Sequence, residues 1–198
     1  MKSIKVEDLA IPLTEYATVS EEDTLHAAVQ ALEKAQSRFR QNRYGHQTVL
    51  VNDRLGFIVG KLSQLDLILA LEAGYRKRGL VDPSRRTTLA RRYVTTELDR
   101  LKLWQKPLAE LCREGREVRV REIMQTPQRG EYIGCDATLD EAIHRMALGR
   151  YRSLLVTQWG KITGVLRLCD VFEKIHQTLK QCPPPDRAPE RYSPLKVV

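Results

Sequence analysis

The sequence lacks the short motifs that mark most catalytic and metal-binding chains. It contains no HExxH, no GxSxG, no GxGxxG and no phosphate-binding GxxxxGK loop. Its four cysteines form no CxxC pair, and neither they nor the four histidines show a metal-ligand spacing. We therefore expect a binding protein rather than an enzyme, with no required cofactor and no metal.

Long apolar segments are also absent. The opening residues, MKSIKVEDLAIPL, contain no apolar stretch of the signal-peptide type, and no segment reaches the roughly 20 apolar residues that cross a membrane. The absence of such segments and the absence of paired cysteine motifs predict a cytoplasmic protein in a reducing compartment, without a membrane partner. The 198 residues are 42% hydrophobic and 29% charged, which is typical of one or two small globular domains.

The sequence contains one unit twice. Residues 56–66 align with residues 160–170 at an offset of 104, and an earlier block aligns at an offset of 114. In the later block the matched residues are Gly56, Ile58, Gly60, Leu62 and Asp66, which fall on Gly160, Ile162, Gly164, Leu166 and Asp170. In the earlier block they are Val6, Thr24, Leu25 and Ala28, which fall on Val120, Thr138, Leu139 and Ala142. The first copy carries about ten extra residues, most of them near 37–47.

The pattern of apolar residues in each copy predicts a strand, a helix, two strands and a second helix, in that order. Apolar residues recur at i, i+3, i+4 and i+7 from Leu25 and again from Leu139, which indicates an amphipathic helix. Continuously apolar strands follow, TVLV and SLLV, and each is joined by a glycine turn to a second strand. The last helix is expected to start at Ser63 or Arg167, and in the first copy to end at Gly79. The predicted fold class is α/β, of the α+β type.

This ordered series resembles a pair of CBS domains (cystathionine β-synthase domains), also called a Bateman module. The resemblance covers about 1–79 and 117–180. It rests on the V-x-D/E openings, the Thr-Leu pairs at 24–25 and 138–139, the strands TVLV and SLLV, and G-x-x-S-x-x-D at 60–66. It implies two β-α-β-β-α repeats packed with pseudo-two-fold symmetry. The expected division is repeat 1 at 1–79, a basic helical insert at 80–118, repeat 2 at 119–180 and a Pro-rich tail at 181–198.

The resemblance also implies a ligand site at Ser63 and Asp66. In this family the Ser or Thr and the Asp of the motif often hold an adenosine nucleotide between the repeats, the Asp on the ribose diol and the hydroxyl near the phosphate. AMP, ADP, ATP and S-adenosylmethionine are the expected ligands. A carboxylate can accept hydrogen bonds from both vicinal hydroxyls, and a helix N-terminus favours phosphate. The alternative is structural, with Ser63 as the N-cap and Asp66 as a first-turn acid.

The second copy departs from this pattern, because Arg167 replaces the small hydroxyl residue beside Asp170. The Arg167 guanidinium either neutralises a phosphate or fills the cleft and pairs with Asp170. Arg152 lies where the family places a basic residue that reaches phosphates, although a solvated surface position is the alternative. We therefore expect Ser63 and Asp66 to form the main site and the second cleft to be altered.

The insert carries most of the excess positive charge. Residues 82–121 contain eleven Lys and Arg against six Asp and Glu, a net +5 out of +8 for the chain, and predict helices at 85–104 and 107–115. A solvated helical face is one interpretation, and a nucleic-acid-binding patch is the other. The sequence as a whole leaves three functional hypotheses: an adenosine-ligand sensor, a nucleic-acid-associated protein, and a ligand-free structural subunit. Exposed apolar positions on the helices of both repeats, together with the resemblance, predict a homodimer.

Overall fold

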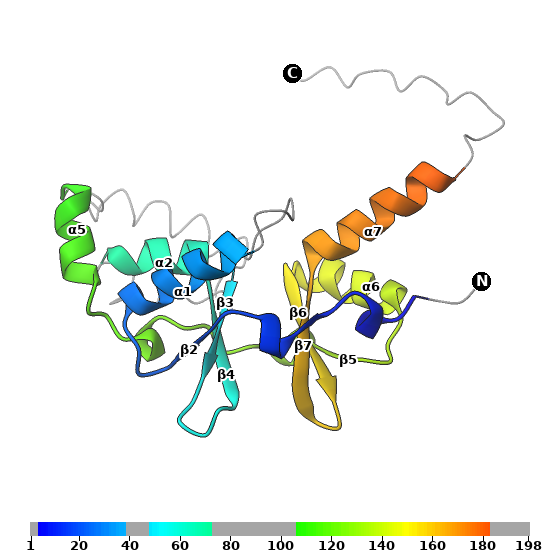
Figure 1. Ribbon diagram of the computed structural model, residues 1–198, viewed down its shortest axis with the longest axis horizontal. Coiled ribbons are helices and arrows are strands. Elements are labelled where there is room, and N and C mark those ends of the chain that lie inside the picture. Colours follow the sequence, from blue (N-terminus) through cyan, green and yellow to red (C-terminus); the bar gives the residue numbers. More distant parts are fainter. Residues whose placement is uncertain (1–3, 39–47, 73–105, 183–198) are drawn as a thin grey trace, which may run out of the picture.

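The computed structural model describes residues 4–38, 48–72 and 106–182, which form two similar units side by side (Figure 1). Short 3-10 turns at Val6–Asp8 (η1) and Leu13–Glu15 (η2) flank β1 (Ile11–Pro12) near the start of the chain. The first unit then contains the following strands and helices: β2 (Thr18–Ser20), α1 (Leu25–Arg38), β3 (Thr48–Asn52), β4 (Ile58–Ser63) and α2 (Gln64–Leu71).

The second unit repeats this order. It follows α5 (Leu108–Gly115) and two 3-10 turns, η4 (Val120–Glu122) and η5 (Arg129–Glu131). Its strands and helices are β5 (Tyr132–Gly134), α6 (Leu139–Gly149), β6 (Ser153–Gln158), β7 (Lys161–Arg167) and α7 (Leu168–Gln181). The predicted α/β class and the doubled strand–helix–strand–strand–helix order are confirmed.

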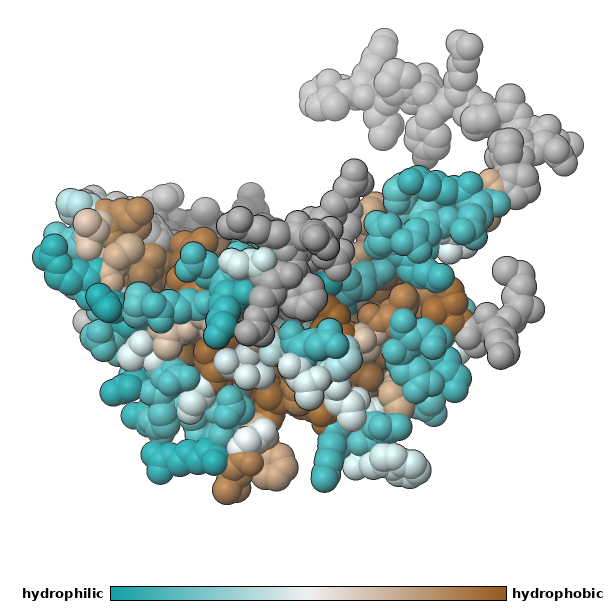
Figure 2. Space-filling model, in the orientation of Figure 1, coloured by the Kyte–Doolittle hydropathy of each residue, from teal (hydrophilic) through white to brown (hydrophobic). Residues whose placement is uncertain are grey.

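Each unit is built around a small sheet with the same pairing. In the first, β2 runs parallel to β3 and β3 antiparallel to β4; in the second, β5, β6 and β7 pair in the same way. Both hairpins turn through a glycine with positive φ, Gly56 at 84° and Gly160 at 74°, as the sequence predicts. The two hairpins point the same way, and the helices lie toward the opposite end (Figure 1). The hairpin ends form separate projections with a notch between them (Figure 2).

The opening segments of the two units are exchanged. Val6 is fully buried in the core of the second unit, and its backbone N–H donates to Ala137 O at 2.9 Å. Val120 is fully buried in the core of the first unit, and its N–H donates to Asp23 O at 2.8 Å. In addition, β1 joins the sheet of the second unit as an antiparallel partner of β7. Neither core is complete without a segment that precedes the other copy in the sequence.

A third apolar cluster lies between the two sheets. Tyr16, Leu50, Leu155 and Val165 are its buried members, and they come from the segment before β2 and from β3, β6 and β7. The two units therefore share a dry contact at their centre as well as the exchanged segments.

Two helix boundaries differ from the sequence prediction. Helix α2 ends at Leu71 with Glu72 in an extended conformation, well short of the predicted end at Gly79. Gly74 follows soon after in the sequence, and glycine costs about 1 kcal/mol in a helix interior. Pro107 is the N-cap of α5 rather than its first residue, and Gly115 is its last helical residue, shifts of one position. Most of the insertion near 37–47, the helix predicted at 85–104, residues 73–79 and nearly all of the tail lie outside the described residues.

Among the described residues, no helix is long and apolar enough to cross a membrane.

The exchange makes a reciprocal prediction about local stability. Val6→Ala should lower amide hydrogen-exchange protection in β6 and β7, and Val120→Ala should lower it in β3 and β4. Each variant removes two buried methyl groups from one core, at a cost of roughly 2 kcal/mol. The two variants serve as matched controls for each other. Loss of protection in the unit that carries the substitution in its own sequence would contradict the exchange.

Candidate ligand-binding site

Ser63 and Asp66 form a complete capping box at the start of α2. The Asp66 N–H donates to Ser63 Oγ at 3.3 Å, and the Asp66 carboxylate accepts from the Ser63 N–H at 2.7 Å and from the Ser63 hydroxyl at 2.6 Å. Asp66 is only 1% exposed, which is unusual for a carboxylate. The structural role that the sequence allowed for this pair is therefore present, and it leaves the predicted ligand role open.

A polar network from the second unit reaches the same place. The side-chain amide of Gln125 donates to Asp66 Oδ1, and the backbones of Gln125 and Lys61 exchange two hydrogen bonds of 2.9 and 3.0 Å. Beside them, Lys61 of β4 forms an ion pair with Glu131 of η5, whose side chain is 8% exposed. Buried charges are retained only where they are paired, and here each pair joins one unit to the other.

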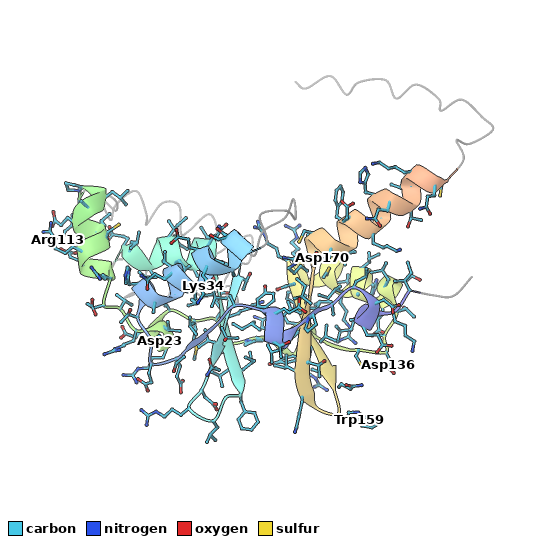
Figure 3. All side chains as sticks on the ribbon, in the orientation of Figure 1. Asp23, Lys34, Arg113, Asp136, Trp159 and Asp170 are labelled. Carbon is cyan, nitrogen blue, oxygen red and sulfur yellow. The ribbon has the colours of Figure 1, made fainter. Side chains whose placement is uncertain are left out.

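The corresponding helix start in the second copy is closed by an ion pair. Arg167 Nε donates to Asp170 Oδ2 and Arg167 Nη2 to Asp170 Oδ1, both at 2.6 Å, in a bidentate arrangement. Burial lowers the pKa of the Arg167 guanidinium, but the hydrogen bonds and the negative charge of Asp170 outweigh this and hold it above its ordinary value. Asp170 lies at the inner end of α7, toward the middle of the molecule (Figure 3). Of the two alternatives that the sequence left open for Arg167, the structure contains the pairing with Asp170.

Tyr16 occupies the space next to this pair. Its side chain packs with Leu50, Leu155 and Val165 and is 6% exposed. Burial raises the pKa of Tyr16 to about 12, although the charge of Arg167 and a side-chain hydrogen bond with Thr48 both act to lower it. A buried phenol of this kind is neutral at physiological pH and is held by its hydroxyl as well as by its ring.

The second copy has no side chain at the position matched to Tyr16. The offset of 114 residues that matches the two copies places Gly130 there, and β2 and β5 match at the same offset. Gly130 is exposed, and a Cβ at this position would lie 2.7 Å from the hydroxyl of Tyr151. The Tyr16 side chain fills one of the two matched positions, and at the other the Tyr151 side chain lies against Gly130.

The residue pairs at the two matched sheet edges also differ, because one pair is polar and the other is apolar. Gln125 pairs with Lys61 across the first sheet edge, and the matched residues at the second edge, Ile11 and Val165, are apolar. The first place is lined by Ser63, Asp66 and the inter-unit network, whereas the second is lined by apolar side chains and one closed ion pair.

The remaining predicted site residue, Arg152, lies in the second unit. The Arg152 side chain is exposed, and its backbone carbonyl accepts from the Leu168 N–H at 2.9 Å, which places it beside the start of α7 rather than α2. Among the described residues, no group of three or more His, Cys, Asp or Glu side chains is arranged to hold a metal ion.

The described part of the basic insert is largely paired. Lys106 contacts Glu110 at 3.2 Å and Glu114 at 2.5 Å, and Arg121 contacts Glu22 at 2.9 Å. Most of the basic residues on which the nucleic-acid hypothesis depends lie between 85 and 102, outside the described residues.

Sequence reasoning missed Tyr16, Gln125, Lys61 and Glu131. None of them belongs to a motif, and their importance depends on which segments of the two copies meet. The repeat alignment contains one signal, because Tyr16 stands opposite Gly130. Without the fold, that difference has no spatial meaning.

The raised pKa of Tyr16 predicts a pH dependence of stability. Between pH 10 and about 12 the unfolded chain loses the phenolic proton while folded Tyr16 keeps it. The free energy of unfolding should then fall by up to about 1.4 kcal/mol per pH unit from this group alone. Urea unfolding of wild type and Tyr16→Phe at several pH values isolates this contribution, because all other tyrosines and lysines are shared. Wild type should lead by about 1 kcal/mol at pH 8 and lose that lead by pH 11. A difference that stays constant over this range would contradict the assignment.

Comparison with known proteins bears on the fold described above. No protein-family model matches the sequence, and no curated protein matches it. Solved structures do match. A CBS-pair protein, CBSX2 from Arabidopsis thaliana, is 16% identical, with 91% of this chain and 100% of that chain covered and a TM-score of 0.57.

Two further structures show the same likeness. CBSX2 in complex with AMP is 16% identical over 89% of this chain and 98% of that chain, with a TM-score of 0.54. A putative acetoin utilization protein (AcuB) from Vibrio cholerae is 19% identical over 91% of this chain and 95% of that chain, with a TM-score of 0.55. The doubled unit, its paired sheets and these matches lead to one conclusion: the chain has the fold of a tandem CBS-domain pair.

Proposed function

We propose that this chain is a non-catalytic regulatory module that binds an adenosine-containing ligand at Ser63 and Asp66. The observation that carries the proposal is the buried Asp66 carboxylate, which lies at a helix N-terminus and contacts a residue from the other repeat. An exposed glycine, Gly130, stands where the matched position of the other copy holds Tyr16.

The hydrogen-bond capacity of Asp66 defines how a ribose would bind. A carboxylate has about four acceptor positions, and two on Oδ2 are used by Ser63 and one on Oδ1 by Gln125. A vicinal diol needs two acceptor positions, so the Gln125 amide or the Ser63 hydroxyl must give way. A released Ser63 hydroxyl at the N-terminus of α2 is then well placed for a phosphate oxygen.

This exchange supplies a route from ligand to conformation. Gln125 belongs to the opening segment of repeat 2, whose residues Val120 and Ile123 complete the core of repeat 1. A ligand that replaces the Gln125–Asp66 hydrogen bond changes a contact between the repeats. It can shift a conformational equilibrium only if its affinity differs between the two arrangements, and this contact provides such a difference.

The known structures support the ligand class at the level of the fold. One of the matching structures is a complex with AMP. At 16% identity the likeness covers the fold, so the choice among AMP, ADP, ATP and S-adenosylmethionine rests with experiment.

Exposed apolar side chains support the expected homodimer. Leu65 and Ile68 of α2 are 50% and 51% exposed. On α7, Phe172, the match of Ile68, is 55% exposed, and Ile175, the match of Leu71, is 36% exposed. An apolar stripe repeated on both helices offers a self-complementary surface for a two-fold dimer.

Calorimetric titration of the four ligands tests the site. Asp66→Ala should lose about 2–4 kcal/mol of binding, roughly thirtyfold to several hundredfold in dissociation constant, because it removes both ribose acceptors. Asp66→Asn keeps the shape and one acceptor and should show an intermediate loss. Asp170→Ala is the matched control in the other repeat and should bind like wild type.

Thermal unfolding must accompany these titrations, since loss of the capping box also lowers stability by about 1 kcal/mol. Equal affinity for wild type and a folded Asp66→Ala would contradict the site. A larger loss in Asp170→Ala would assign the ligand to the second copy instead. No binding of any of the four ligands to wild type would favour the ligand-free structural subunit.

Light scattering tests the dimer. Wild type should show about twice the chain mass of 22.8 kDa at micromolar concentration. Ile68→Glu places a charge in the expected contact and should shift the mass toward that of one chain. Leu148→Glu, on a leucine of α6 that is 75% exposed, is the control and should leave the dimer intact. A wild type that is monomeric throughout would rule out the interface.

A further inference from the structure

The two matched places between the repeats share an aspartate, Asp66 or Asp170, and differ in the residues around it. Tyr16 stands against Gly130, and Arg167 stands against Ser63. The matched edge pairs also differ, Ile11 with Val165 in the second place and Gln125 with Lys61 in the first. The residues of the second place are bulkier or less polar than their matches in the first, where Gly130 lies against Tyr151 and the other residues carry hydrogen-bonding groups.

The Tyr16 side chain fills the second place well. Its ring packs among apolar side chains from three strands, and its hydroxyl shares a hydrogen bond with Thr48. A buried aromatic ring with a satisfied hydroxyl has both of its requirements met, and an aromatic side chain buries 150–250 Å² in typical proteins. Tyr16 therefore occupies its site as a well-bound flat ligand would.

Arg167 completes the closure at the helix start. Its guanidinium engages both oxygens of Asp170 and is itself 6% exposed, so the carboxylate matched to Asp66 presents its two oxygens to the protein's own cation. Opening this pair without replacing it would leave buried charges unpaired, which is strongly unfavourable.

We propose that Tyr16 and Arg167 are an internal substitute for a ligand in the second place, so that the chain binds one ligand and not two. This inference rests on the proposed function, because it assigns the single ligand to Ser63 and Asp66. The filled place is a permanent joint between the repeats. Ligand-dependent change is then confined to the first place, where the contacts between repeats are polar and exchangeable.

Two reciprocal sets of variants test the proposal by calorimetry with AMP and ATP. Tyr16→Gly combined with Arg167→Ser gives the second place the residues of the first, and the number of sites per chain should rise from one to two. Asp170→Ala added to this variant should remove the new site. Gly130→Tyr combined with Ser63→Arg gives the first place the residues of the second and should reduce binding at least a hundredfold.

The outcomes separate the two proposals. A wild type that binds two ligands per chain overturns the internal substitute, as does a folded Tyr16→Gly/Arg167→Ser variant that gains no site. If wild type binds neither AMP nor ATP, the proposed function fails. In that case a new site in Tyr16→Gly/Arg167→Ser that is lost on adding Asp170→Ala still supports the internal substitute. Tyr16→Gly empties a buried position. Where it unfolds the chain, the wild-type stoichiometry and the Gly130→Tyr/Ser63→Arg variant decide. Unchanged affinity in that variant overturns the proposal.

Discussion

The exchange of opening segments is the constraint on which the rest of the structure depends. Val6 and Val120 are fully buried, each in the core of the opposite repeat. Neither repeat can bury its apolar residues without the other, so the two fold as one body although the sequence reads as two copies. The same exchange brings Gln125 to Asp66 and Glu131 to Lys61. The candidate site is thus a consequence of how the cores are completed.

A doubled sequence folded with approximate two-fold symmetry produces two matched helix starts between the repeats. One carries Ser63 and Asp66, the other carries Arg167 and Asp170, and their surroundings differ. One contains a closed Arg167–Asp170 pair beside the buried Tyr16 ring, and its hydrogen bonds and packing are internal. The other contains a buried carboxylate whose partners come from both repeats, and there the match of Tyr16 is Gly130, which lies against Tyr151. The proposal assigns stability to the place that holds Tyr16 and the ligand to the place that holds Asp66. A polar contact between repeats can be exchanged for a ligand at small net cost, whereas a packed aromatic ring cannot.

Local patterns predicted the elements well, because helix periodicity, continuous apolar strands and glycine turns are encoded within a few residues. The Ser63–Asp66 capping box and the Arg167–Asp170 pair follow from spacings of three residues and were both predicted from the sequence. The end of α2 was placed wrongly, since a basic turn and a distant glycine outweighed Gly74 in the prediction. Tyr16 and Gln125 were missed because they act across the repeat interface, and no local pattern states which copy a segment packs against.

The most direct measurement of the central claim is a crystal structure of the full chain grown with AMP. The account predicts one nucleotide per chain, with its ribose hydroxyls on Asp66, the Gln125–Asp66 hydrogen bond replaced, and Tyr16 and the Arg167–Asp170 pair unmoved. A nucleotide bound at Asp170 with the Tyr16 ring displaced would contradict it.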